Sequence, residues 1–229
     1  MDLSSIEKKI GVTFLNKDLL LEALTHRSYS NEHTDWKLGH NERLEFLGDA
    51  VLEIVVTEYL FNKFKNPEGD LTSWRAALVN SQMLSKIATE IDVNEHLLLS
   101  RGETKDTGRA RQVILANALE AIIGAIYLDQ GIESAGKFIS QFILPKLPTI
   151  IEDKLFQDAK SLFQEIAQDK EGITPNYEVL AQWGPDHDKH FRIGVYLGED
   201  LIAEGEGASK QEAQRNAAQR ALEEKAWQK

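Results

Sequence analysis

The segment from residue 114 to residue 128, ILANALEAIIGAIYL, is apolar around nearly the whole circumference of a helix. A helix without a polar face is stable only when other elements cover it, so it belongs at the centre of a helical domain. Apolar residues also recur at helical spacing over residues 44–64 and 71–91, and the turn residues 66–70 (NPEGD) separate these two segments. Residues 1 to about 144 are therefore predicted to form an all-α domain.

The pattern changes after Pro145 and Pro148, which interrupt the helical spacing. An amphipathic helix is predicted first, three β-like runs follow, and Ser209 with Glu212 forms a capping box that begins a last helix. These elements are predicted at residues 159–170, 177–182, 191–197, 201–206 and 209–225. The order α-β-β-β-α is that of a small α+β domain. We place the all-α domain at residues 1–149, a linker at 150–157 and the α+β domain at 158–229.

Composition narrows the class of protein. The chain has no cysteine, which excludes disulfides, thiolate zinc sites and cysteine nucleophiles. Neither a membrane-spanning segment nor a secretory signal is expected, because no apolar run reaches about eighteen residues and the first residues, MDLSSIEKKIGVTF, are polar. These features favour a cytoplasmic protein. The net charge of −11 argues against a general nucleic-acid binder, although nucleases that use metal ions also collect carboxylates.

Acidic residues occur where the predicted helices should be buried. Glu42, Glu45 and Asp49 fall within roughly 60° of arc on one helix face. Glu120 is the only charged residue in the apolar segment 114–128, and Asn117 lies one turn before it. A solvated face could explain the first group and a buried salt bridge the second. A divalent cation shared by the two helices explains both, and oxygen ligands favour Mg²⁺ or Mn²⁺ over zinc.

The segment NERLEFLGDAVL (41–52) resembles the signature of the ribonuclease III family. The resemblance continues through LTHRSY (24–29), PEGDLT (67–72) and ILANALEAIIGAIYLD (114–129). It implies a homodimeric endonuclease that uses Mg²⁺, for which Mn²⁺ can substitute. The resemblance implies that Glu45, Asn117 and Glu120 bind the metal and that Asp49 acts with Glu120 in catalysis. It also implies that Glu42 and Glu68 lie at the rim of the catalytic valley and support the site. Phe46 is implied to insert into a socket on the partner subunit. Asn117 departs from the aspartate that many members carry, and an amide ligand brings no charge.

The second domain resembles a double-stranded RNA-binding domain in three segments: DAKSLFQE (158–165), GPDH (184–187) and ASKQEA (208–213). The minor groove of an A-form RNA duplex is wide and lined with 2′-hydroxyls, and polar side chains recognise it. We expect Gln164 and His187 to make these contacts. Phosphates need cations near the start of the last helix, for which we expect Lys210 and Arg215. The family often has further basic residues where this chain has Gln211 and Gln214, so weak and salt-sensitive binding is expected.

The function expected is hydrolysis of phosphodiester bonds in double-stranded RNA with Mg²⁺-activated water, in the processing of ribosomal precursors and other structured RNA. One alternative is a protein on the same fold that binds duplex RNA without cutting it. A ribosome-associated structural protein is a second alternative, and a basic composition is expected of such a protein.

Overall fold

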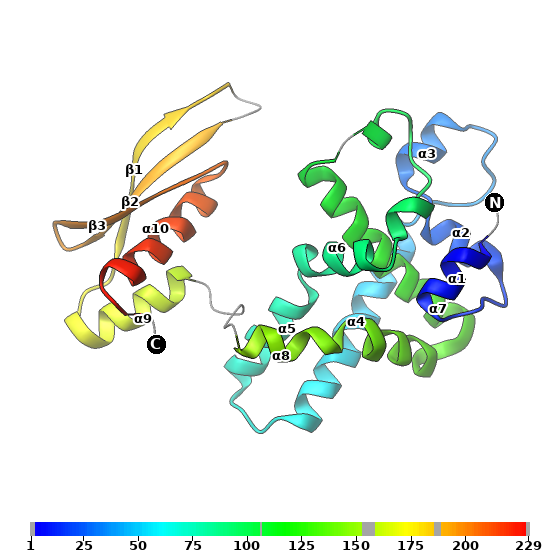
Figure 1. The fold of residues 1–229 in the computed structure, drawn as a ribbon, viewed down its shortest axis with the longest axis horizontal. Coiled ribbons are helices and arrows are strands. Elements are labelled where there is room, and N and C mark those ends of the chain that lie inside the picture. The colour runs from blue at the N-terminus through cyan, green and yellow to red at the C-terminus, as the bar shows by residue number, and fades with distance from the viewer. Residues whose placement is uncertain (1–2, 106, 153–158, 186–188, 228–229) are drawn as a thin grey trace. The chain divides into compact units, whose positions relative to one another are not determined.

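The computed structural model describes residues 3–105, 107–152, 159–185 and 189–227. The chain divides into two compact units, Met1–Phe156 and Gln157–Lys229 (Figure 1). Each unit has its own hydrophobic core. The first unit is helical and the second is a three-stranded antiparallel sheet with helices, as the sequence predicts. The expected fold class is therefore confirmed.

The first unit is built around two long helices, α4 (Glu42–Lys63) and α7 (Arg109–Phe142), which share its most extensive contact. Residues 114–116, 118, 119 and 121–126 of α7 are buried, as expected for a helix without a polar face. An 18-residue window within Arg109–Glu152 is apolar enough to cross a membrane, with a mean hydropathy of 1.4, but 61% of that window is buried inside the protein. Burial of this kind is typical of a core helix. Gly131, with φ of 81°, breaks the helical backbone of α7.

Shorter elements cover these two helices. Their bounds are α1 (Ser4–Ile10), α2 (Lys17–Ala23), α3 (Arg27–Glu32), α5 (Glu68–Val79), α6 (Ser81–Glu90), η1 (Val93–His96), η2 (Glu103–Lys105), η3 (Leu144–Lys146) and α8 (Leu147–Glu152).

The helical spacing over residues 71–91 belongs to two helices, α5 and α6, and not to one. The backbone at Asn80 is extended, with φ of −70° and ψ of 156°, and its side chain accepts a hydrogen bond of 2.9 Å from the Met83 amide. Because asparagine satisfies free amides at a helix start, one segment becomes the two helices α5 and α6. The predicted turn at 66–70 is shorter than expected, since α5 already begins at Glu68.

The expected linker, 150–157, begins inside a helix. Residues 150–152 belong to α8, and Ile150 is buried in the core of the first unit. Hydrophobic burial thus holds this part of the segment on the helical unit. Residues 153–157 lie outside the described residues.

In the second unit, α9 (Ala159–Glu171) and α10 (Lys210–Glu224) cover one face of the sheet formed by β1 (Asn176–Trp183), β2 (His190–Leu197) and β3 (Asp200–Gly207), in the order β1-β2-β3 (Figure 1). Alternate residues of β2, such as Val195 and Leu197, pack against Phe163 and against alanines of α10. The Ser209 hydroxyl caps α10 by accepting from the Glu212 amide at 3.2 Å. The Glu212 carboxylate accepts from Ala208, one residue earlier than a standard capping box has it.

Candidate functional site

The closest approach of α4 and α7 occurs at Gly48 and Gly124. A Cβ atom built on Gly48 would lie 1.7 Å from the backbone oxygen of Glu120, and one on Gly124 would lie 2.3 Å from the backbone oxygen of Leu44. The two helix backbones therefore nearly touch, which only glycine permits. Sequence reasoning missed both residues, although a glycine inside a strongly helical pattern is a signal of close packing.

This contact brings together the acidic residues predicted from the two segments. Glu45 and Asp49 flank Gly48 on α4, while Asn117 and Glu120 lie two turns and one turn before Gly124 on α7. Burial of the carboxyl group, followed by the negative charges of Asp49 and Glu45, raises the pKa of Glu120 to about 8. The side chains of two helices thus form one electrostatic cluster, the acidic cluster (Glu45, Asp49, Asn117 and Glu120).

Asn117 interacts directly with this cluster. Its amide forms a hydrogen bond with the Glu45 carboxylate that lowers the pKa of Glu45, but burial and the charge of Glu42 outweigh the effect and raise that pKa. Asn117 is thereby placed one hydrogen bond from an acid on the other helix.

The donor set of the acidic cluster fits a hard divalent cation, because three carboxylates and an amide supply oxygen only. Among the described residues, no three Asp, Glu or His side chains are already placed to hold one ion. The raised pKa of Glu120 marks a charge that the fold alone does not compensate.

The other acids predicted for the site differ in position. Glu42 lies at the start of α4, where its carboxylate is 3.3 Å from the Arg27 guanidinium and 3.8 Å from His40 Nδ1, and its charge acts on Glu45. Glu68 lies at the first position of α5 and lines a separate pocket. Their roles at the rim of a catalytic valley stay predictions.

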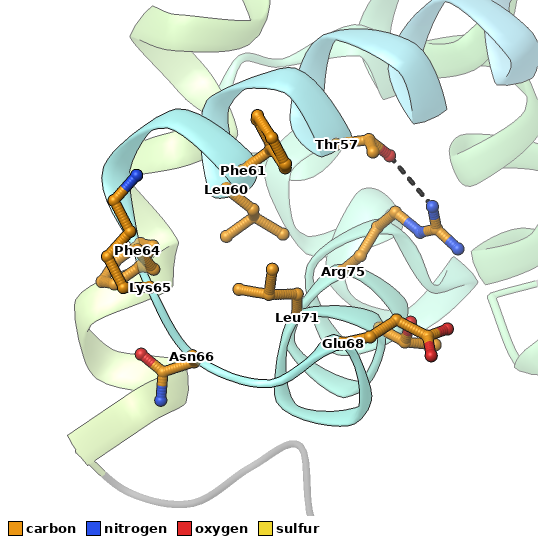
Figure 2. A pocket seen from close by; sticks show the side chains of 10 residues that line it. Thr57, Leu60, Phe61, Phe64, Lys65, Asn66, Glu68, Leu71 and Arg75 are labelled. Atoms are coloured by element: carbon orange, nitrogen blue, oxygen red, sulfur yellow. Dashed lines mark hydrogen bonds between the residues drawn. The ribbon is translucent and has the colours of Figure 1, made fainter.

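The pocket is formed by the C-terminal half of α4, the following turn and the start of α5 (Figure 2). Its volume is about 560 Å³, and Leu60, Phe61, Phe64 and Leu71 supply much of its wall. Arg75 donates a hydrogen bond of 2.9 Å to the Thr57 hydroxyl and forms an ion pair of 2.9 Å with Glu53. The result is an apolar hollow with a fixed cation at its edge, which the sequence did not predict.

Large apolar side chains lie exposed along α4. The exposed fractions are 82% for Phe46, 57% for Ile54 and 70% for Phe61. Spacings of eight and seven residues keep the three on one side of the helix, within about 80° of arc. Phe46 is thus no part of the core, and we call these three residues the α4 stripe.

The residues expected to contact RNA in the second unit are exposed where described. Gln164 lies on α9, and Lys210 and Arg215 lie in the first two turns of α10. The Lys210 ammonium is 5.9 Å from the centroid of the Phe191 ring. His187 lies outside the described residues. These RNA contacts stay predictions.

Comparison with known proteins bears on both units. Residues 16–147 match the ribonuclease-III-like family, and residues 159–225 match the double-stranded RNA binding motif. Ribonuclease 3 of a Nitratiruptor species is 45% identical over 221 residues, which cover 96% of this chain and 95% of that protein. Ribonuclease 3 of Carboxydothermus hydrogenoformans is also 45% identical, with coverage of 97% and 95%. Among solved structures, the nuclease domain of ribonuclease III from Campylobacter jejuni is 44% identical and covers 64% of this chain and 99% of its own, with a TM-score of 0.58.

Proposed function

The chain belongs to the ribonuclease III family, and we propose that its acidic cluster binds Mg²⁺ when the enzyme hydrolyses double-stranded RNA. Endonuclease activity on duplex RNA follows from the family and from its two domains. The observation that carries the choice of metal is the all-oxygen donor set around Glu120, whose pKa is raised to about 8 by burial and by two neighbouring acids. We further propose ribosomal precursors and other structured RNA as substrates.

The metal and the side chains of the site have different roles in the proposed reaction. Mg²⁺ at this position would acidify a water molecule and neutralise the negative charge that develops on the phosphate and on the leaving 3′ oxygen. Asp49 is exposed beside the half-buried Glu120, so this pair can orient the attacking water and accept its proton. Asn117 keeps the Glu45 carboxylate oriented through its hydrogen bond.

Cleavage of a long RNA duplex by the purified full-length protein tests this function. We expect fragments in the presence of Mg²⁺ or Mn²⁺ and intact duplex in excess EDTA. A DNA duplex of the same sequence serves as the control and should remain uncut. Cutting of RNA at an equal rate in EDTA would contradict the metal site, while binding without cutting in Mg²⁺ would favour the alternative of a non-cleaving binding protein.

Asn117 offers a specific test of the ligand set. Replacing it with aspartate adds a negative charge beside the ion without changing the shape of the side chain, so the Mg²⁺ concentration for half-maximal cleavage should fall. At saturating metal we expect little gain in rate, because Glu45 and Asp49 repel the new charge. Asn117→Ala should raise the Mg²⁺ requirement and preserve the helix. A metal titration of cleavage compares the three proteins, and identical curves would remove Asn117 from the site.

We also propose that the enzyme acts as a homodimer joined through the α4 stripe. The related Campylobacter jejuni nuclease domain has a region involved in dimer formation. In a two-fold interface each contact occurs twice with the roles exchanged. If two α4 helices pack antiparallel with Ile54 near the axis, Phe46 of one copy lies opposite Phe61 of the other. Phe61 lines the apolar pocket of Figure 2, which would receive that phenylalanine.

Phe46→Ala should therefore weaken the dimer. Burial of a phenylalanine side chain contributes about 1.5–3 kcal/mol to the free energy of association. Its loss should therefore raise the dimer dissociation constant by about ten-fold or more. Because Phe46 is 82% exposed within its own chain, the monomer should lose little stability. Leu15→Ala is the matched control, since Leu15 is 83% exposed and lies outside α4. Sedimentation at several concentrations measures both, and an equal effect of the two changes would rule out this interface.

A further inference from the structure

The second unit must bind a polyanion although it is acidic. From residue 153 to residue 229 the sequence has fifteen acidic and ten basic residues. Some of the cations are already neutralised: Lys225 forms an ion pair of 2.9 Å with Glu171, and Arg192 one of 2.6 Å with Glu206. The phosphates of the RNA are therefore expected to contact mainly the few cationic side chains that have no carboxylate beside them.

Lys160 is such a cation. Its ammonium donates a hydrogen bond of 2.9 Å to the side-chain oxygen of Gln214 and lies 4.9 Å from the centroid of the Tyr177 ring. In the part of the chain that the structure describes, no carboxylate forms an ion pair with it. An amide oxygen and an aromatic face both orient a lysine without cancelling its charge.

The Lys160 side chain reaches the start of α10. Gln214 follows Lys210 by four residues and so lies on the same face of α10, one turn further on. The hydrogen bond to Gln214 therefore places the Lys160 ammonium beside the first two turns of α10. Free amides at the start of this helix and the helix dipole already favour an anion there.

We propose that Lys160 is a phosphate-binding residue of the RNA-binding unit, held in position by Gln214 and Tyr177. It supplies from α9 the positive charge that α10 lacks at position 214, where a neutral glutamine accepts its hydrogen bond. A lysine at position 214 would repel Lys160, so the neutral residue is what allows the ammonium to lie there. This inference rests on the RNA contacts proposed for Lys210 on the same surface.

The salt dependence of binding tests the proposal. Each phosphate contact releases about 0.9 of a counterion, so the slope of log K against log[salt] counts the cations that meet phosphate. We expect Lys160→Gln, in the full-length protein with a short RNA duplex and EDTA, to reduce the magnitude of this slope by about 1 and to lower affinity about fivefold near 0.15 M salt. Lys160→Arg keeps the charge and should restore the slope.

Two further variants separate the possible outcomes. Lys225→Gln removes an equal charge from a lysine that is paired with Glu171, and it should leave the slope unchanged. Lys210→Gln tests the proposed surface itself and should reduce the slope. A slope reduced by Lys210→Gln but unchanged by Lys160→Gln would overturn the role of Lys160 alone. A slope unchanged by both would overturn the RNA contacts on which the inference rests. Equal reductions by Lys160→Gln and Lys225→Gln would show only an effect of net charge and would also overturn the proposal.

Discussion

Glu120→Ala is expected to abolish cleavage of duplex RNA and to leave binding of the duplex nearly unchanged. Glu120 is the half-buried centre of the acidic cluster, and no residue proposed to contact RNA in the second unit depends on it. Loss of a metal ligand that also acts at the reaction centre should lower the rate by at least about a thousand-fold. A cleavage assay and a gel-shift assay on the same preparation measure both properties, and cleavage at the wild-type rate would remove Glu120 from the site.

The pH dependence of the stability of the metal-free enzyme reports on the raised pKa of Glu120. Burial raises the pKa of Glu120 from its ordinary value of 4.5 to about 8 in the folded state. The stability that the protonated acid contributes is thus fully present below pH 4.5 and is lost as the pH rises through about 8. Glutamine keeps the shape and cannot ionise, so Glu120→Gln should unfold at a higher temperature than the wild type above pH 8, but not near pH 4.5.

Thermal unfolding in EDTA across this range tests the prediction, and the gain at high pH should be a few degrees. Saturating Mg²⁺ should stabilise the wild type more than Glu120→Gln and so reduce the difference. A difference in unfolding temperature that did not change with pH would mean that Glu120 is not the group that burial and its neighbours perturb.

The sequence predicted the parts of this site that follow from periodicity. An apolar helix with one acid at its centre indicated that the other ligands of a shared cation come from another helix, and the charges of Asp49 and Glu45 on α4 do act on Glu120 in the fold. Periodicity also separated the helical unit from the α+β unit, because repeats of about 3.6 and 2 residues are distinct over about ten residues or more. These features depend on which residues share a face, which the sequence records directly.

Other features depend on the distance between elements, which the sequence records poorly. The near contact of Gly48 with Glu120 and the pocket around Phe61 arise only when α4, α5 and α7 pack together. The break at Asn80 was missed for a local reason, since apolar spacing continues across it while one side chain caps the next helix. Local capping there outweighs a periodic pattern that would allow one long helix.

The close approach of α4 and α7 leaves no room for a side chain at Gly124, so Gly124→Ala should disturb both the packing and the site. Its Cβ would lie 2.3 Å from the Leu44 backbone oxygen, far inside normal contact, and a backbone atom cannot move away as a side-chain end can. The two helices must separate by about 1 Å or more, which costs on the order of 1–3 kcal/mol or more in a packed core. The same movement draws Glu45 and Asp49 away from Asn117 and Glu120, so cleavage should fall by about a hundred-fold.

Gly136→Ala is the matched control, because it makes the same chemical change in the helical part of α7 beyond the break at Gly131, where a Cβ would meet nothing within 4 Å. Alanine is favoured over glycine in a helix by about 1 kcal/mol, so this variant should be as active as the wild type and slightly more stable. Cleavage is compared at saturating Mg²⁺ well below the unfolding temperature of each protein, so that a lower rate reports the geometry of the site and not unfolded enzyme. Duplex binding should be retained in both variants, since the second unit is unchanged. Should Gly124→Ala match Gly136→Ala in both rate and stability, α4 and α7 would not approach as closely as the structure has them, and the juxtaposition of the acidic cluster would need another cause.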